Sequence, residues 1–374
     1  MSTGPEVLEL PADQYKRTKI DPDKPPLPYR AGLQLRIKRH IPPPPFGIGY
    51  FQEPTHPHHL SWDELDQFST PSEYCLQRRP PRETRSHRDQ SIHTLDIVEE
   101  IATGDHRGAQ IVACRTDLVP DRIVAAKIYD PLYYNFPDVD PVYQSDADYS
   151  CEAFAYRRLE IVGVDGLHVP AYYGSWTFEM PFAREPVRMR AVCMILMERL
   201  PGPSVYALLK SGHFVDSTEG WPPNSVEGSL LNGKAAQILV TKCRIAGEEK
   251  ELRLNLRNRL NVLRKSMELY TILLVLGVKQ RDLAARNIVV TNVDEAGDLG
   301  VAIADFSIAC VLGTSISKDP MLTTWPSPAV EARFEDNISE WVPELGTNRY
   351  DEEYKFGKWV SLCWPRGRYE ESDP

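Results

Sequence analysis

Proline is spread unevenly along this chain, and it restricts the first quarter more than any other feature of the sequence does. Of the 32 prolines, 15 fall in the first 90 residues, and four stand in succession at residues 42–45. Proline has no backbone N–H and interrupts helices and strand ladders. We therefore expect residues 1–92 to form a Pro-rich N-terminal extension, partly extended or disordered. Residues 33–37, which alternate like a strand, and a short acidic helix at 61–68 are candidates to dock on the rest.

From about residue 93 the pattern changes, first to short strands and then to helices. Runs rich in Val and Ile, bounded by turn residues, are typical of strands. The strands expected on this basis are 95–101, 109–115, 122–129, 168–176 and 188–197. A helix is expected at 149–160. The strongest helical pattern covers 251–276, where apolar residues recur at steps of three and four and Gly277 follows as a candidate C-cap. Strands followed by helices indicate an α+β fold.

The composition narrows the class of protein further. The chain has 374 residues, 42% of them hydrophobic, with a formal net charge of −10. An acidic chain is a poor general partner for nucleic acid. Its seven cysteines form no CxxC pair, which argues against a zinc module or a disulfide framework. The most apolar stretch, 269–278, is about half as long as a membrane span, and no signal peptide begins the chain. We expect an intracellular protein, cytoplasmic or nuclear, with no membrane partner.

The most informative string is QRDLAARNIVV at residues 280–290, directly after the long helix pattern. An Asp five residues before an Asn, with a β-branched strand next, is what a phosphoryl-transfer loop needs. Asp282 can accept a hydroxyl proton, while the amide oxygen of Asn287 can ligate Mg²⁺. The alternative interpretation is a turn at a helix end, with a capping Asp and a solvated Asn.

A second acidic residue ends a small apolar strand. Residues 301–307 read VAIADFS, which places Asp305 at the carboxyl end of the strand. Such an Asp can hold Mg²⁺ against phosphates. If Asp305 stood by itself, the favoured interpretation would be an Asp that terminates a buried strand.

Lys127 lies in the apolar strand pattern VAAK and Glu152 in a helix pattern. A strand lysine needs a carboxylate to hold its ammonium in place, and Glu152 is a candidate for that partner. In isolation, Lys127 is equally a solubilising charge on an edge strand and Glu152 a residue of a solvated helix face. Their order with Asp282, Asn287 and Asp305 favours one shared site.

Two glycines, Gly104 and Gly108, lie between the strand patterns 95–101 and 109–115. Glycine allows backbone N–H groups to approach phosphate oxygens. A strand, not a helix, follows Gly108, so a dinucleotide-binding βαβ unit is excluded. A plain hairpin turn is the alternative.

Taken together, these strings resemble protein kinases. Residues 281–287 are similar to the kinase catalytic loop, 301–307 to its metal-binding strand end and 124–127 to its lysine strand; residues 324–330 resemble the end of an activation segment. The closest likeness is to the divergent, shortened kinase-like proteins of filamentous fungi. The sequence departs from the family pattern at Gln280, at Ser307 and in the spacing of the glycines.

The resemblance implies a bilobal protein-kinase-like fold with a β-rich N-lobe and an α-helical C-lobe that is truncated after the central helix. The N-lobe and hinge would cover 93–200 and the C-lobe 201–366, with a polar insertion at 212–250 and a tail at 367–374. Residues 352–360 resemble the central helix of the C-lobe.

The resemblance also implies roles for the site residues. Lys127 would contact the α- and β-phosphates of ATP and be held by Glu152, and Asp282 would orient or deprotonate the acceptor hydroxyl. Asn287 and Asp305 would hold Mg²⁺. The nucleotide would also meet Gly104 and Gly108, and the backbone of Glu198 and Leu200.

The expected function is ATP-dependent transfer of the γ-phosphoryl group to a protein or small-molecule hydroxyl. Two alternatives are a pseudokinase that binds nucleotide or partners with little catalysis, and transfer of a nucleotidyl group from the same site. All three require Lys127 and Asp305 to face one shared cleft.

Overall fold

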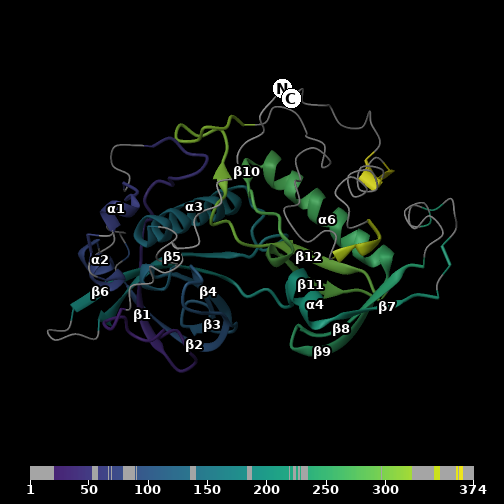
Figure 1. Cartoon of the computed structure of the whole chain (residues 1–374), viewed down its shortest axis with the longest axis horizontal. Helices are drawn as coiled ribbons and strands as arrows, with labels where there is room; N and C mark the ends of the chain where they lie inside the picture. Colours follow the sequence, from purple (N-terminus) through teal and green to yellow (C-terminus); the bar gives the residue numbers. More distant parts are fainter. Residues whose placement is uncertain are drawn as a thin grey trace.

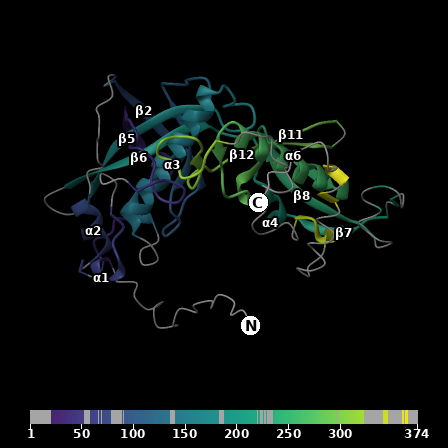
Figure 2. The same cartoon turned by 90° about the horizontal axis from the view of Figure 1, so that it is seen from above.

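A computed structural model gives the arrangement of the chain (Figures 1 and 2). The structure describes residues 21–52, 58–65, 67–68, 70–78, 89, 91–134, 140–182, 188–218, 220–221, 225, 228, 235–295, 297–321, 341–345, 359–360 and 362–364.

Six strands close an antiparallel barrel at one end of the molecule. In chain order they are β1 (Gln34–Arg39), β2 (Ile92–Ala102), β3 (Gln110–Thr116), β4 (Val124–Tyr129), β5 (Tyr172–Phe182) and β6 (Arg188–Glu198). Their order around the barrel is β1-β2-β3-β4-β6-β5. β1 closes the barrel because it pairs with β2 on one side and with β5 on the other. Closure removes the free strand edges that an open sheet would expose.

The longest helix of the first half, α3 (Pro141–Ile161), lies against this barrel (Figure 1). The side chain of Asp140 caps its first turn by accepting from the N–H groups of Val142 and Tyr143, and Pro141 occupies the first helical position. Two short helices, α1 (Trp62–Leu65) and α2 (Pro71–Arg78), precede the barrel strand β2.

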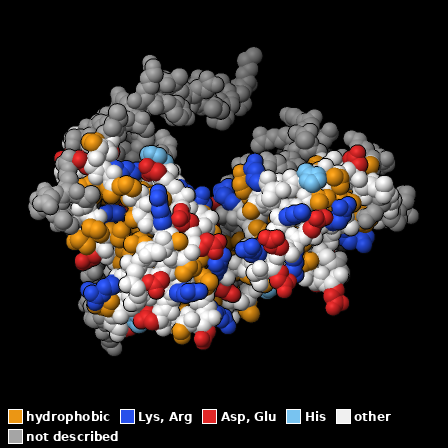
Figure 3. Space-filling model, turned by 90° about the horizontal axis from the view of Figure 1, so that it is seen from below, with side chains coloured by type: hydrophobic (Ala, Val, Ile, Leu, Met, Phe, Trp, Pro, Cys, Tyr) orange, Lys and Arg blue, Asp and Glu red, His pale blue; other side chains and the backbone are white. Residues whose placement is uncertain are grey.

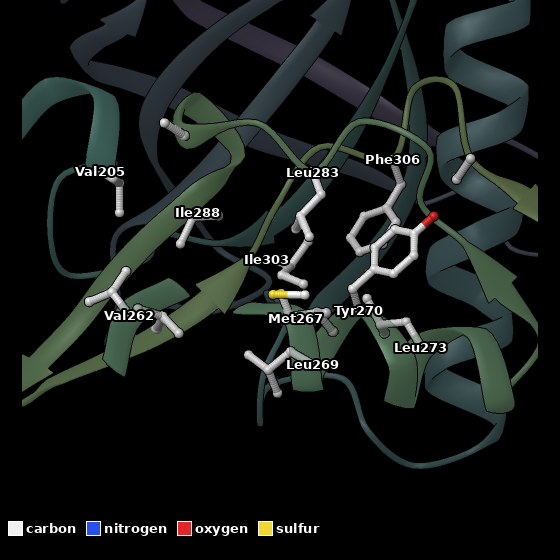
Figure 4. Close-up of a cluster of buried hydrophobic side chains, with 14 of the residues drawn as sticks. Val205, Val262, Met267, Leu269, Tyr270, Leu273, Leu283, Ile288, Ile303 and Phe306 are labelled. Carbon is white, nitrogen blue, oxygen red and sulfur yellow. The ribbon is translucent and has the colours of Figure 1, made fainter. Parts of the chain in front are cut away.

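The other end of the molecule combines small sheets with two helices. The helices are α4 (Val205–Ser211) and α6 (Leu256–Val275); the strands are β7 (His213–Asp216), β8 (Gln237–Ile245), β9 (Glu248–Leu254), β10 (Val278–Lys279), β11 (Ile288–Val293), β12 (Leu299–Ile303) and β13 (Cys310–Val311). They form the sheets β7-β8-β9, β11-β12 and β10-β13. Buried apolar side chains of α6 pack with those of the β11–β12 hairpin (Figure 4).

The prediction of a bilobal kinase-like fold with an α-helical C-lobe is wrong. Among the described elements strands outnumber helices, six of the strands form a closed barrel, and in 201–366 there are seven strands beside α4 and α6. The largest cause is the segment read as a polar insertion, 212–250, which supplies β7, β8 and the start of β9. The β8–β9 turn has positive φ at both Ala246 and Gly247, the geometry that tight hairpins prefer. The hairpin turn was not predicted because its first residue is Ala246, a residue type that is not typical of such turns.

Most individual elements agree with the sequence-based expectations. The strand at 33–37 is confirmed as β1, and the strands at 95–101, 109–115, 122–129 and 188–197 as β2, β3, β4 and β6. The helix expected at 61–68 forms only as α1, and the strand expected at 168–176 begins later, as β5. α3 begins eight residues earlier than predicted. The helix expected at 251–276 is confirmed as α6, although its first residues belong to β9. Gly277 follows it with φ +87°, as a helix C-terminus favours.

Among the residues that the structure describes, none of the helices combines the length and apolar character that crossing a bilayer requires.

Candidate functional site

Three of the predicted site residues meet directly. Lys127 comes from β4, Glu152 from α3, and Asp305 from the segment after β12. Lys127 Nζ lies 2.6 Å from Glu152 Oε2 and 2.8 Å from Asp305 Oδ1. The requirement that Lys127 and Asp305 face the same place is therefore met.

Glu152 is the centre of this contact. It is fully buried, and its Oε2 also accepts a hydrogen bond from the Tyr129 hydroxyl at 2.7 Å. Its Oε1 accepts from the backbone N–H of Phe306 at 3.2 Å. Successive side chains of a strand point to opposite faces, so residues two apart lie on the same face. Tyr129 therefore lies on the same face of β4 as Lys127. Glu152 thus joins β4 and α3 to the segment after β12.

Phe306 anchors that segment in the core. Its side chain is fully buried and packs edge-on against Tyr156 of α3, with ring centroids 5.2 Å apart. On its other side lie apolar residues of α6, among them Met267 and Tyr270 (Figure 4). Burying an aromatic side chain between two helices fixes the neighbouring Asp305 in place.

The charges at this contact depend on one another. Burial disfavours a charged Lys127, but Asp305 and Glu152 outweigh that effect and raise the lysine pKa above its usual value. Burial would likewise raise the pKa of Asp305, yet Lys127 and the Ser307 N–H lower it to about 2. About a third of the Asp305 side chain (34%) remains exposed. One cation therefore faces two carboxyl groups, and the accessible one is an anion.

The backbone at Asp305 has a left-handed conformation, with φ +64°. This is uncommon for a residue with a side chain and marks strained sites that are often functional. The Ser307 N–H donates to Asp305 Oδ1 at 3.1 Å and supports the turn. Ser307 itself is not among the described residues with positive φ. A serine at this position therefore does not need the positive φ that glycine tolerates best.

The predicted catalytic loop forms a second contact. Asn287 Nδ2 donates to the backbone oxygen of Asp282 at 2.9 Å and to its Oδ2 at 2.8 Å. Arg286, at 2.8 Å from both carboxylate oxygens, also pairs with Asp282. Asp282 and Asn287 are thus neighbours, as the five-residue spacing predicts. The carboxylate of Asp282 carries two side-chain donors, and an incoming hydroxyl would have to share it with them.

Gln280 joins the two contacts. It is fully buried, and its amide group donates to the backbone oxygens of Asp282 and Asp305 at 2.9 and 2.8 Å. The Ala304 N–H also donates to the backbone oxygen of Asn287 at 2.8 Å. β11 begins directly after Asn287 and β12 ends two residues before Asp305. Asn287 and Asp305 therefore lie side by side at the open end of the β11–β12 hairpin.

The oxygen atoms here suit a Mg²⁺ ion that arrives with a nucleotide. Mg²⁺ is usually bound by one or two carboxylates together with substrate phosphates, rather than by a full protein cage. Asn287 contributes an amide oxygen and Asp305 the exposed side of a carboxylate. The part of the chain that the structure describes contains no group of three or more His, Cys, Asp or Glu residues that could hold a metal on its own.

One buried side chain supports the loop that contains Gly104 and Gly108. The buried side chain of Gln110 accepts from the Gly104 N–H at 2.7 Å and donates to the backbone oxygens of Gly104 and Gly108. Gly108 has φ +92°, but Gly104 has no positive φ. Since the Gly104 N–H is satisfied by Gln110, this loop offers a phosphate fewer donors than its two glycines suggest.

At the end of β6, Glu198 is tied to the residue before β5. Its N–H donates to the backbone oxygen of Ala171, and its carboxylate accepts from the Ala171 N–H. No described backbone group pairs with Leu200. Any backbone contact to a nucleotide base from this segment would therefore use Leu200 or the carbonyl of Glu198.

Sequence reasoning missed several residues that hold the site together: Tyr129, Gln280, Gln110 and Arg286. Tyr129 had a usable signal, because it follows Lys127 by two residues in one strand. Gln280 was noted only as a departure from the family pattern. The segment 324–330, read as the end of an activation segment, lies outside the described residues.

Comparison with protein-family models and with curated proteins found no match to this chain.

Proposed function

We propose that the chain is an ATP-dependent phosphotransferase that moves the γ-phosphoryl group to a hydroxyl. The observation that carries the proposal is the position of Lys127, which lies within hydrogen-bond distance of both Glu152 and Asp305. The proposal stands on these side chains and on the loop 280–287, not on the fold, which differs from the one the resemblance implied.

Each group has a task that its surroundings support. The ammonium of Lys127 offers positive charge to phosphate oxygens, and Glu152 fixes its direction. Asp305 and Asn287 would hold Mg²⁺, which neutralises charge on the transferring group. Asp282 orients the acceptor hydroxyl and accepts its proton. Because the groups are already joined through Gln280, little reorganisation is needed before transfer.

A second candidate is a nucleotide-binding or scaffold module with little turnover. Two observations favour it: the Gly104 N–H is occupied by Gln110, and the Asp282 carboxylate is occupied by Arg286 and Asn287. The first weakens the hold on phosphate, and the second reduces the capacity of Asp282 to accept a proton from an acceptor.

The partners expected are ATP, Mg²⁺ and an acceptor of unknown class. Lys, Arg, Asp and Glu side chains are interspersed on the face shown in Figure 3. Such mixing on an acidic chain gives no positive surface for nucleic acid there.

The test follows two signals for the wild type and for Asp282→Asn. The first is the shift in Tm on adding ATP with and without Mg²⁺, since a ligand that binds the folded state stabilises it. The second is ADP release and transfer of labelled γ-phosphate to the protein itself or to protein and metabolite acceptors. Mass spectrometry of the products separates phosphorylation from nucleotidyl transfer.

A phosphotransferase gives a Mg²⁺-dependent shift and turnover, and only the turnover is lost in Asp282→Asn. A shift without turnover in the wild type supports the binding module. If ATP gives neither a shift nor turnover, the proposed function is wrong.

A further inference from the structure

We infer that the segment 46–51, far from the other site residues in sequence, positions the catalytic groups, with Tyr50 as the principal positioning residue. This rests on the proposed function. The segment contacts three of the four parts of the chain that carry the site: the helix with Glu152, the residues after Asp305, and the residue before Asp282.

The first contact is with α3. The Sγ of Cys151, next to Glu152, donates to the backbone oxygen of Phe46 at 3.2 Å. The Phe46 ring packs edge-on against Tyr143, near the start of the same helix, with centroids 5.1 Å apart. Phe46 therefore contacts α3 both near its first turn and beside Glu152.

The second contact is with the chain that leaves Asp305. The Tyr50 hydroxyl is buried; it accepts from the Val311 N–H at 2.8 Å and donates to the backbone oxygen of Ala309 at 3.4 Å. Gly49 and Phe51 continue the pairing. The backbone oxygen of Gly49 accepts from the Lys318 N–H, and the Phe51 N–H donates to the backbone oxygen of Ile316, both at 2.9 Å.

The third contact explains the glycine at position 49. A Cβ there would lie 2.7 Å from Nη1 of Arg281 and 3.1 Å from Cys310, and the residue has φ +92°. Only glycine fits this backbone and this space. Arg281 directly precedes Asp282 and is itself held at φ +73°. The close approach of Gly49 limits where the arginine can lie.

These contacts have a mechanical consequence. Lys127, Glu152 and Asp305 meet only when α3 and the segment after Asp305 lie in one relative position. Phe306 fixes them from one side, and the segment 46–51 joins them again through Cys151 and Val311. Small displacements of reacting groups cost rate even where binding is kept. Loss of this connection should therefore lower kcat more than it raises KM for ATP.

The test compares Tyr50→Phe with Tyr29→Phe in the full chain. Tyr29 is also buried and precedes β1, but its hydroxyl donates to Asp130, whose carboxylate pairs with Arg190. We expect Tyr50→Phe to lower kcat about tenfold, with KM for ATP changed less than about twofold, because both buried hydrogen bonds of the hydroxyl, to Val311 and Ala309, are lost. Tyr29→Phe should leave both constants within about twofold even where its Tm falls equally.

A second readout needs no turnover. Without nucleotide, the rate at which an amine-acylating reagent modifies Lys127 should rise in Tyr50→Phe and stay at the wild-type value in Tyr29→Phe. Cys310→Ala removes a thiol hydrogen bond to the Gly49 backbone oxygen and should act in the same direction; it serves where Tyr50→Phe does not fold.

The inference is wrong if Tyr50→Phe and Cys310→Ala keep both kcat and the acylation rate of Lys127 at wild-type values. An inactive wild type would instead overturn the proposed function. In that case the acylation rates alone decide whether the segment 46–51 positions Lys127.

Discussion

Two buried ion clusters of the molecule differ in how their charges balance. At Arg259 of α6, one guanidinium meets one carboxylate, Glu344, at 2.5 and 2.8 Å, and both side chains are almost fully buried. The same guanidinium also donates to the backbone oxygens of Trp341 and Gln237. At Lys127, one ammonium meets two carboxyl groups, and one of them, Asp305, is partly exposed.

The difference separates a structural cluster from a candidate site. A closed pair of one cation and one anion, sealed from water, resists change and has no charge left for a ligand. The Lys127 cluster has a carboxylate in excess at its accessible end. That excess charge can attract a metal cation, while the lysine remains fixed by Glu152.

The largest effect is expected at the accessible carboxylate. Asp305→Asn removes the excess charge and the proposed metal ligand but leaves Lys127 paired with Glu152. We expect phosphoryl transfer to fall about a thousandfold or more, since charge neutralisation on the transferring group is lost. The measurement is labelled transfer or ADP release, with Tm as a check on folding. Turnover within tenfold of the wild type would remove Asp305 from the site.

The Arg259–Glu344 pair should affect the stability of the fold and not the rate of turnover. Arg259→Met leaves Glu344 buried without its cation, and we expect the free energy of unfolding to fall by about 3–5 kcal/mol. The kcat of the folded fraction should not change. Arg264→Met is the matched control on the same helix: Arg264 is 47% exposed and pairs with Glu268, so it should cost less than about 0.5 kcal/mol. Denaturant unfolding measures both, and equal costs would contradict the distinction.

Local sequence patterns predicted many of the individual strands and helices but not how they are arranged in the fold. Runs rich in Val and Ile mark β2, β3 and β4; β2 alternates buried and more exposed residues around Leu95 and Ile97, whereas all six residues of β4 are buried. The strands β7 to β9 were missed because 212–250 is polar and its hairpin turn starts with Ala246, not Asn or Asp. Closure of the barrel by β1 depends on pairing across more than 50 residues, which no local pattern encodes.

The site was easier to predict than the fold. Lys127, Glu152 and Asp305 meet, and Asp282 meets Asn287, because a charge buried in an apolar strand or helix needs a partner wherever the chain supplies one. What the sequence could not provide is the long-range support from Gln280, Gln110 and Tyr50. Their partners are set by tertiary contacts, and a polar residue in a loop has many possible partners before the chain folds.

A third acid near Lys127 gives a smaller, pH-dependent effect. Asp148 lies one helical turn before Glu152; burial raises its pKa to about 7, although Gln144 and Lys127 lower it. A carboxyl group with a raised pKa stabilises the fold at low pH, and that stability is lost as pH rises through about 7. The stability of Asp148→Asn relative to the wild type should therefore increase between pH 4 and pH 7. Allowing for solvent screening, we expect about 1 kcal/mol, a few degrees in Tm.

Thermal unfolding of both proteins from pH 4 to pH 9 measures this gain. Asp305→Asn is the contrasting variant, because the pKa of Asp305 is lowered to about 2 and its contribution is lost only below about pH 4. A difference between wild type and Asp148→Asn that stays constant across the range would show that Asp148 does not titrate there.

The smallest effect is expected at Ser307. The resemblance to kinases makes this serine a departure that should hinder the site, whereas the positive φ lies at Asp305, and the Ser307 contact with Asp305 comes from its backbone N–H. Ser307→Gly keeps that N–H, so we expect kcat to change less than about twofold and stability to fall by about 0.5–1 kcal/mol from added backbone freedom. Steady-state kinetics and Tm together test this. A tenfold gain in kcat in Ser307→Gly would mean that the serine does restrain Asp305. The carboxylate that gives the Lys127 cluster its excess charge would then be less free to move than an open metal ligand.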